Sequence, residues 1–470
     1  MTTDEFRTLG HELIDFIANY RDQIETLPVL SSLKPGEVQA QFAASAPETG
    51  DRLAGLVSDL EKLKPALTHF QHPRYFAYFP ANSSLEGVLG DLVSSGLGQL
   101  GLNWQSSPLL TELEEVMTDW MRQALGLSSA WQGVIQDTAS STSLLALMCA
   151  RERTSHYSLN RGGIQAEAKR LIVYTSSQAH SSIEKAVLLA GFGRENLRSV
   201  DTDQNFAMIP EALEAAILHD LEIGNLPCAI VASVGTTTST AIDPISAVSS
   251  IATKYGVWLH VDAAMAGSAM IVPECQHLWA GVESADSIVL NPHKWLGATF
   301  DCTLYYVRDS QHLVRVMSTN PSYLQTSQDG QVKNYRDWGI PLGRRARAFK
   351  LWFLIRSVGL EGLRTRLRRD MANAQWFAAQ IDATPDWVRL APVPLQTVCV
   401  RHEPAGLIGD ALERHTLSWV ERINQSGFAY LTPSKLEGRW MVRVSIGAMT
   451  TELEHVKALW ERMKLEVENG

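Results

Sequence analysis

The chain has 470 residues, a formal net charge of −10 at pH 7, and 45% hydrophobic and 20% charged residues. This length predicts two or three domains, and the balance is typical of a soluble globular chain, which excludes disordered and membrane-embedded classes. The acidic charge disfavours nucleic-acid binding. The main basic cluster, residues 364–369, is interleaved with leucines, so we interpret it as a solvated helix face.

Targeting and redox features predict a cytoplasmic protein. The chain begins Met1-Thr-Thr-Asp-Glu, without the charged and apolar segments of a signal peptide. The longest uncharged stretch, residues 92–111, is diluted by polar residues and glycines and would cross a bilayer poorly. The cysteines form no CxxC pair and are interpreted as reduced thiols: Cys149, Cys228, Cys275, Cys302 and Cys399.

The amino-terminal segment is predicted to be a helical arm. Apolar residues from Phe6 to Tyr20 recur at helical spacing, and Thr3, Asp4 and Glu5 precede them as start signals. A stretch punctuated by prolines follows and has little core of its own. We therefore predict that residues 1–84 form a dimerisation arm whose apolar stripe packs on a second subunit.

From about residue 85, short apolar strands alternate with helical patterns such as 182–190 and 245–255. Continuous apolar strands of this kind are typical of a mostly parallel sheet covered on both faces. Residues 85–350 are therefore predicted to form a large α/β domain, in which ligands gather at the carboxyl ends of the strands. The predicted strands are Leu171–Tyr174, Ala229–Ser233, Val257–Val261 and Ser287–Leu290.

After about residue 350 the pattern changes. Helical patterns are followed by strands near Thr397–Val400 and Met441–Val444, and a final amphipathic helix begins near Glu452. Residues 351–470 are therefore predicted to form a small α+β domain.

Lys294 is the first candidate for chemistry. It follows the predicted strand Ser287–Leu290 and is flanked by His293 and Trp295. A lysine is usually a solvated surface charge, but apolar surroundings favour its neutral form, which is the nucleophile. Lys294 is therefore a candidate for covalent catalysis.

Asp262 ends the strand Val257–Val261 and is followed by small residues such as Ala264. A carboxylate at the tip of a buried strand needs donors or a cation. A helix cap or structural ion pair meets that need, and so does the protonated ring nitrogen of a cofactor. His260 lies on the same face of the strand and is placed to orient Asp262.

Two segments combine glycine with Thr or Ser: Gly133–Ser140 leads into a predicted helix, and Gly235–Thr238 follows the end of the predicted strand Ala229–Ser233. Small hydroxyl residues at the start of a helix can bind an anion, although an ordinary helix cap is their commoner use. His180 precedes another helix at the same predicted sheet edge as Lys294, which favours an active-site role.

Two other motifs are set aside. Residues 96–101 match the dinucleotide fingerprint G-x-G-x-x-G, but no convincing strand precedes them and 115–120 is a helical pattern, so we reject NAD binding. His69 and His72 lack a third metal ligand, so no metal site is predicted.

These segments occur in an order that resembles one family. The turn at Thr138–Ser140, then His180, Asp262 and the motif Asn-Pro-His-Lys-Trp around Lys294, is similar to the group II decarboxylases dependent on pyridoxal 5'-phosphate (PLP). Within that group the chain resembles the aromatic-L-amino-acid decarboxylases, most of all bacterial ones acting on DOPA. The resemblance covers essentially the whole chain and extends to His72-Pro73, Tyr78–Pro80, Trp104–Pro108, Asn320–Leu324 and Ile340–Arg345.

The resemblance implies a fold and an assembly. It implies the α/β architecture of fold type I, similar to aspartate aminotransferase, with a mostly parallel seven-stranded sheet in the large domain. It also implies a homodimer with its active site at the subunit interface.

The resemblance implies roles for the matched residues. Lys294 would form a Schiff base with the cofactor, and Asp262 would pair with the pyridine nitrogen. Ala264 would pack on one face of the ring and His180 on the other. The phosphate would be held by Thr138, Ala139, Ser140, Asn291 and His293, and Thr237 would lie near the cofactor.

Tyr323 would lie on a mobile loop at about residues 320–332 and, aided by His180, would protonate the substrate's α-carbon while the loop excludes water. Family members that make aldehydes carry phenylalanine at the Tyr323 position or asparagine at the His180 position. This sequence has neither change. We therefore predict decarboxylation of an aromatic L-amino acid to the aryl-ethylamine and CO2, with DOPA, 5-hydroxytryptophan, tryptophan, tyrosine and phenylalanine as candidates.

The family's substrate pocket corresponds to an apolar and aromatic set, with Leu100 and Leu102 expected from the partner subunit. Because this set contains no Lys or Arg, a second substrate carboxylate would find no cation. Its members are Phe70, Tyr78, Phe79, Pro80, Ala81, Leu100, Leu102 and Gly343.

Four positions differ from the animal enzymes. Phe70 replaces tryptophan, Leu102 replaces phenylalanine, Ala81 replaces threonine, and Met265 replaces tyrosine. The aromatic class is retained but the catechol preference stays open, and Gly343 leaves room for an indole. The alternatives are oxidative deamination to an aldehyde, a substrate such as histidine, diaminobutyrate or an acidic amino acid, and a non-catalytic PLP-binding module.

Overall fold

The computed structural model describes residues 1–468, and their contacts divide the chain into two compact units. The central unit contains residues 81–372 and 391–397, and the terminal unit contains residues 1–80, 373–390 and those from 398 onward. Each unit is defined by contacts in space and therefore contains separate stretches of the sequence. The division into 1–84, 85–350 and 351–470 stays a prediction.

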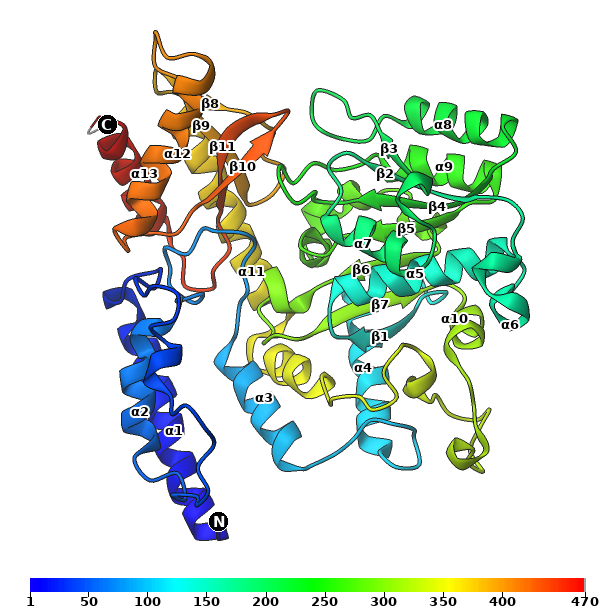
Figure 1. The fold of residues 1–470 in the computed structure, drawn as a ribbon, viewed down its shortest axis with the longest axis horizontal. Coiled ribbons are helices and arrows are strands. Elements are labelled where there is room, and N and C mark those ends of the chain that lie inside the picture. Colours follow the sequence, from blue (N-terminus) through cyan, green and yellow to red (C-terminus); the bar gives the residue numbers. More distant parts are fainter. Residues whose placement is uncertain (469–470) are drawn as a thin grey trace. The chain divides into compact units, whose positions relative to one another are not determined.

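The central unit contains a seven-stranded sheet in the order β1-β7-β6-β5-β4-β2-β3 (Figure 1). Every neighbouring pair from β3 to β6 is parallel, and β7 runs antiparallel to both β6 and β1. The predicted mostly parallel sheet is therefore confirmed. The strands are β1 (Gln132–Gln136), β2 (Leu171–Ser176), β3 (Leu197–Val200), β4 (Leu226–Ser233), β5 (Trp258–Asp262), β6 (Ser287–Leu290) and β7 (Thr303–Val307).

The inner strands form because their residues are apolar on both faces. All residues of β2, β5, β6 and β7 are buried, as expected for a sheet covered by helices on each side. Helix α5 packs against α7 and α10, while α8 packs against α9. The helices are α3 (Leu85–Gly96), α4 (Pro108–Ala124), α5 (Ala139–Thr154), α6 (Leu159–Gly162), α7 (Ser181–Leu189), α8 (Pro210–Glu222), α9 (Ile245–Tyr255), α10 (Ser310–Met317) and the part of α11 (Ala348–Asp382) that precedes residue 373.

The motif Gly96–Gly101 follows helix α3 and not a strand, which agrees with the rejection of a dinucleotide site. A dinucleotide fingerprint would need a strand to deliver its first glycine to the edge of the sheet.

The terminal unit combines helices with a four-stranded sheet in the order β10-β11-β9-β8. Helix α1 begins with a capping box in which Thr2 and Glu5 bond each other's backbone N–H groups. No residue of α1 is buried, and Phe6 and Ile14 are 60% and 45% exposed. The elements are α1 (Thr3–Gln23), α2 (Leu56–Leu63), β8 (Trp387–Arg389), β9 (Thr397–His402), α12 (Gly409–Gln425), β10 (Thr432–Leu436), β11 (Arg439–Ser445) and α13 (Leu453–Glu468).

None of the helices in residues 1–468 combines the length and the apolar character that a bilayer crossing requires.

Candidate active site

The carboxyl ends of three parallel strands lie in register at one edge of the central sheet. Ser233 of β4 pairs with Asp262 of β5, and Asp262 pairs with Val289 of β6. Because parallel strands all end at the same edge, the segments that follow them converge there. One such contact is the 2.8 Å hydrogen bond from the Asn291 N–H to the Ala264 carbonyl oxygen.

Asp262 is the carboxylate at this edge and is only 8% exposed. Its Oδ1 accepts the Ala264 N–H at 3.1 Å, which fixes the side chain beside the turn after β5. His260 was expected to orient Asp262, but its Nδ1 lies 2.9 Å from the Ser287 hydroxyl instead. Because β5 and β6 pair His260 directly with Ser287, these two side chains lie side by side on the same face of the sheet.

Lys294 lies in the turn after β6, and its backbone, at φ −96° and ψ −108°, leaves the helical region. Its N–H donates to the Asn291 carbonyl at 2.9 Å, and its own carbonyl accepts from Asn82 Nδ2 at 3.1 Å. Lys294 is half-buried, and the next residue, Trp295, is fully buried. The backbone thus holds this lysine at the sheet edge from both sides.

Trp295 is anchored by residues that the sequence did not single out. Its Nε1 donates to Asp370 Oδ2 at 2.9 Å, and Arg366 donates to the Trp295 carbonyl. The prediction of a solvated face at 364–369 is therefore wrong for Arg366, whose side chain is 11% exposed and lies 3.8 Å from Asp370. A buried carboxylate needs cationic partners, and Arg366 faces inward to supply one.

Burial and the charges of Asp262 and Lys294 all act on the pKa of His180. Burial lowers the pKa of His180; the charge of Asp262 opposes this and that of Lys294 adds to it. The ring caps helix α7, with Nδ1 accepting the Ser182 N–H at 3.1 Å. Since Nδ1 is an acceptor, the neutral ring carries its proton on Nε2.

An anion cradle lies at the start of α5. Thr138 is the helix cap, and the N–H groups of Ala139 and Ser140 have no acceptor within the helix because they belong to its first turn. The Thr303 hydroxyl lies 2.8 Å from the Asp137 carbonyl and 2.9 Å from Asn291 Oδ1. Thr303, which the sequence analysis missed, thus joins this cradle to the end of β6.

His293 adds a neutral donor near the cradle. Its Nδ1 accepts the Cys302 N–H at 3.0 Å, so the proton of the neutral ring is on Nε2. Burial, and then the charge of Lys294, lower the pKa of His293 to about 4. Helix N–H groups, hydroxyls and an imidazole N–H are the donors that a phosphate needs, so these residues fit the phosphate of PLP.

The turn carrying Thr237 depends on a glycine. Gly235 has φ +84°, and a Cβ there would lie 2.5 Å from Ala266 Cβ. Only glycine combines that backbone conformation with such a close approach. Gly235 therefore brings the Thr236–Thr238 turn close to the segment after β5.

The predicted pocket residues fall in both units. Phe70, Tyr78, Phe79 and Pro80 belong to the terminal unit, and Ala81, Leu100, Leu102 and Gly343 belong to the central unit. Within the central unit a Cβ at Gly343 would meet Leu100 Cδ1 at 3.2 Å, so these two residues lie together. Tyr323 lies in a short 3-10 turn, Ser322–Leu324, with 78% of its surface exposed.

A cation does lie beside part of this set, contrary to expectation. The Arg443 guanidinium is 4.7 Å from the centroid of the Phe79 ring and donates to the Tyr78 carbonyl at 3.0 Å. Burial lowers the pKa of Arg443 to about 10. An arginine inside the apolar run 441–444 was the available signal, but sequence does not reveal contacts 365 residues apart.

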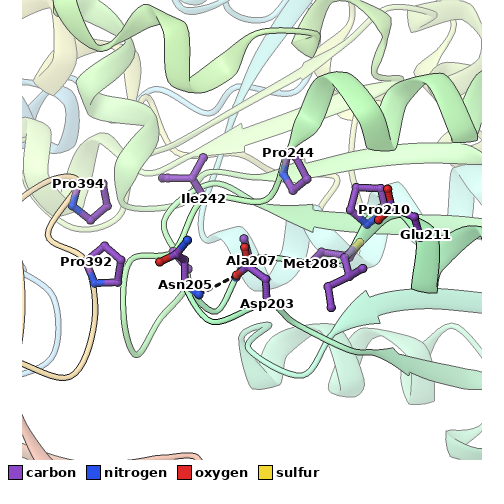
Figure 2. A pocket seen from close by; sticks show the side chains of 12 residues that line it. Asp203, Asn205, Ala207, Met208, Pro210, Glu211, Ile242, Pro244, Pro392 and Pro394 are labelled. Atoms are coloured by element: carbon purple, nitrogen blue, oxygen red, sulfur yellow. Dashed lines mark hydrogen bonds between the residues drawn. The ribbon is translucent and has the colours of Figure 1, made fainter.

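A separate cavity of about 610 Å³ opens in the central unit between the turns before α8 and α9 and the segment 391–397 (Figure 2). Four prolines line it, at 210, 244, 392 and 394, together with Asp203 and Glu211. Its lining, taken over the described chain, contains none of the predicted site residues. In residues 1–468 no group of three or more His, Cys, Asp or Glu side chains is arranged to hold a metal ion.

The fold and the site define a PLP-dependent enzyme of fold type I: a mostly parallel seven-stranded sheet with a lysine, an aspartate and an anion cradle at one edge. The chain belongs to the pyridoxal-dependent decarboxylase family, because the model of the pyridoxal-dependent decarboxylase conserved domain matches residues 35–403. The predicted family and cofactor are therefore confirmed.

Individual relatives agree over nearly the whole chain. The chain is 39% identical to tyrosine decarboxylase of Papaver somniferum, over 97% of this chain and 93% of that protein. It is 39% identical to phenylacetaldehyde synthase of Arabidopsis thaliana, over 99% and 96%. The crystal structure of Oryza sativa TDC with PLP and tryptamine superposes with a TM-score of 0.96 at 35% identity, covering 100% of this chain and 99% of that one.

Proposed function

We propose that this protein is a carboxy-lyase that converts an aromatic L-amino acid into the corresponding aryl-ethylamine and CO2. The observation that carries the proposal is the convergence of Lys294, Asp262 and His180 at the carboxyl edge of the central sheet. Tyrosine decarboxylase and the TDC that binds tryptamine support the aromatic class.

Some of the site residues bind the cofactor, and others hold or transfer a proton. Bound PLP supplies an aldehyde that captures the substrate amine and a conjugated ring that accepts the electron pair left when CO2 departs. Lys294 Nζ holds the cofactor between turnovers. Asp262 would hold a proton at the ring nitrogen, and His180 and Ala264 would pack against the ring.

The remaining site residues anchor the phosphate and deliver a proton. The phosphate would be held by Thr138, Ala139, Ser140, Asn291 and His293, with Thr237 near the cofactor. The Tyr323 hydroxyl, aided by His180, passes a proton to the α-carbon while its loop excludes water.

The substrate wall combines Phe70, Tyr78, Phe79, Pro80 and Ala81 with Leu100, Leu102 and Gly343. The contact between Leu100 and Gly343 within one chain means that a partner subunit supplying Leu100 would supply Gly343 as well. Arg443 is committed to the Tyr78–Phe79 turn, so we retain an aromatic substrate over an acidic one. DOPA is one candidate, and the indole and phenol amino acids are others.

We further propose a cytoplasmic homodimer. The exposed apolar side chains of α1, including Phe6 and Ile14, are the surface for a second copy. All five cysteines are buried thiols that form no disulfide, as expected in a reducing compartment.

Aldehyde formation is the second candidate, because a phenylacetaldehyde synthase is 39% identical over nearly the whole chain. Tyr323 and His180 are both present, which favours the amine.

A product assay tests the proposal. Protein with added PLP is given DOPA, 5-hydroxytryptophan, tryptophan, tyrosine, phenylalanine, histidine and glutamate, and amine, CO2, aldehyde and hydrogen peroxide are measured. Equal amounts of amine and CO2 from an aromatic substrate are expected. Aldehyde with peroxide would favour the second candidate, and turnover of histidine or glutamate alone would contradict the assigned substrate class.

A further inference from the structure

The loop that carries Tyr323 is held by a network of side chains, although Tyr323 itself is 78% exposed. A side chain this exposed takes its position mainly from the backbone of its loop. The position of Tyr323 therefore depends on the residues that fix the backbone between Asn320 and Asn334.

Asp329 is the centre of this network. Its Oδ2 accepts the Thr326 N–H at 3.1 Å. Its Oδ1 accepts the Thr326 hydroxyl and Asn334 Nδ2, both at 2.9 Å. The Thr326 backbone hydrogen bond is the largest cause of a lowered pKa for Asp329, so the carboxylate stays ionised at neutral pH. One charged side chain thus closes the turn that follows Tyr323 and ties it to the end of the loop.

Asn334 connects this turn to the body of the central unit. While its Nδ2 donates to Asp329, its Oδ1 accepts the Trp104 N–H at 3.1 Å. Two residues further on, the Arg336 N–H donates to the Leu102 carbonyl at 3.2 Å. The segment that carries Leu102, a proposed substrate-wall residue, is thereby joined to the loop that carries Tyr323.

The beginning of the loop is fixed as well. Arg336 Nη2 donates to Asn320 Oδ1 at 3.3 Å, so the two ends of the loop are bonded across 16 residues. Between these ends, Asp329 contacts both Thr326 and Asn334, which makes it the residue whose loss would free most of the loop.

We propose that Asp329 is a positioning residue: through Thr326 and Asn334 it holds the Tyr323 loop in the conformation that protonates the α-carbon, and so keeps the product an amine. This inference rests on the proposed function. An Asp-capped turn is common in loops of any kind, but here the capped turn lies between the proton donor and Asn334, the residue bonded to the backbone of Trp104.

The chemical consequence of a displaced loop follows from the electron balance. Normally a proton from Tyr323 meets the electron pair that decarboxylation leaves on the α-carbon. If that proton is withheld in air, dioxygen takes two electrons from this carbon and becomes hydrogen peroxide. Water then releases ammonia, so that amino acid, O2 and H2O give aldehyde, CO2, NH3 and H2O2.

The experiment compares variants of the full-length holoenzyme in air, measuring kcat, KM and the ratio of amine to aldehyde. Asp329→Ala should lower kcat by about tenfold or more with little change in KM, and should raise the aldehyde share. Asp329→Asn should fall between the wild type and Asp329→Ala, because its Oδ1 can still accept from the Thr326 hydroxyl and from Asn334, while its Nδ2 can no longer accept the Thr326 N–H.

Exchanging the hydrogen-bond donor and acceptor between positions 329 and 334 tests whether Asp329 positions the loop or only stabilises the protein. Asn334→Asp sets two carboxylates against each other and should behave like Asp329→Ala. The double variant Asp329→Asn/Asn334→Asp restores one donor and one acceptor and should recover kcat and the amine. The matched control is Asp203→Ala, which removes two backbone hydrogen bonds in the turn of Figure 2 and should leave both readouts unchanged.

The outcomes separate this inference from the function beneath it. Wild-type protein that makes no amine refutes the proposed function. Amine production at the wild-type rate by Tyr323→Phe refutes the proton donor and the inference with it. If Tyr323→Phe makes aldehyde while Asp329→Ala keeps wild-type kcat and product ratio, or if the double variant fails to recover what Asn334→Asp loses, Asp329 is only a turn cap and the inference is overturned.

Discussion

At the scale of single residues, the site is organised by burial and by the contacts of each polar atom. Asp262 is 8% exposed and held by the Ala264 N–H, while His180 and His293 are neutral rings with their protons on Nε2. Buried polar groups keep one protonation state and one orientation only when each is bonded. The buried Asp262 and His293 are therefore each held in one orientation by a hydrogen bond, while the more exposed His180 is held by the Ser182 N–H.

Asp262→Asn should separate binding from chemistry. The amide cannot hold a proton at the cofactor's ring nitrogen, so kcat is expected to fall on the order of a hundredfold, as when one electrostatic partner is removed. Cofactor content should stay close to the wild type because the phosphate cradle is untouched. Kinetics with the visible spectrum of the purified protein measure both, and Asp309→Asn, a distant helix cap, is the control. Full activity in Asp262→Asn would contradict the assigned role.

His260 should make stability depend on pH. Burial lowers its pKa to about 4 from the ordinary histidine value of about 6.5, so the unfolded chain binds the extra proton between these values. The free energy of unfolding should therefore fall as pH drops from 6.5 towards 4, by about 2 kcal/mol at pH 5 from this residue. Urea unfolding at pH 7 and pH 5 measures the change. His260→Gln should show a shallower pH dependence than the wild type, and an unchanged slope would argue against this origin.

At the scale of elements, turns place the site residues at the sheet edge. Gly235 has φ +84° and lies where a Cβ would meet Ala266 Cβ at 2.5 Å. Gly224 has nearly the same φ, +85°, but open space around it. An alanine at Gly224 would meet only the cost of the positive φ, whereas an alanine at Gly235 would meet that cost and a steric contact as well.

Gly235→Ala should weaken cofactor binding, while Gly224→Ala should not. Both variants are expected to lose about 1 kcal/mol or more of stability from the positive φ, but only the first displaces the Thr236–Thr238 turn. Cofactor dissociation during dialysis and thermal unfolding give the two measurements. Equal cofactor affinity in the two variants would show that the close approach to Ala266 is unimportant.

The sequence predicted the strands whose residues form a continuous apolar run, because such a run indicates burial on both faces of a sheet. The strands at 171–174, 229–233, 257–261 and 287–290 are apolar on both faces, and each was found within a few residues of its observed limits. Strands β1, β3 and β7 were not specified. β3 is a short edge strand with only Val200 buried, and β1 contains Gln132, Gly133 and Gln136, so neither has a continuous apolar pattern.

Contacts between distant segments account for what the sequence did not reveal in the site. The motif around Lys294 was identifiable because its chemistry lies in consecutive residues. Thr303, Asp370 and Arg366 were missed because each becomes relevant only through a partner at least 12 residues away, at Asn291 or Trp295. Such pairings depend on the folded sheet, and periodicity does not encode them.

At the scale of the whole molecule, the unburied helix α1 is the main feature that the single chain leaves unexplained. Every residue of α1 is at least partly exposed, and Phe6 is 60% exposed. An amphipathic helix is stabilised mainly by packing of its apolar face, so a second copy is the expected cover.

Phe6→Asp combined with Ile14→Asp should therefore reduce dimerisation. Charges on the apolar stripe of α1 would be desolvated in the interface, so the dimer fraction and the activity per chain should fall together. Analytical ultracentrifugation over a range of protein concentrations, run beside the activity assay, measures both. A charge change at the exposed Glu12 is the control. An active monomer would contradict the proposed assembly.

The most direct test of the account is to locate the cofactor on the chain. Holoenzyme is reduced with borohydride, which fixes PLP to the lysine that holds it, and the digested protein is analysed by mass spectrometry. The added mass is expected on the peptide that contains Lys294, and Lys294→Ala is expected to lose both the visible absorbance and decarboxylation. Labelling of a different lysine, or an active Lys294→Ala variant with an unchanged spectrum, would contradict it.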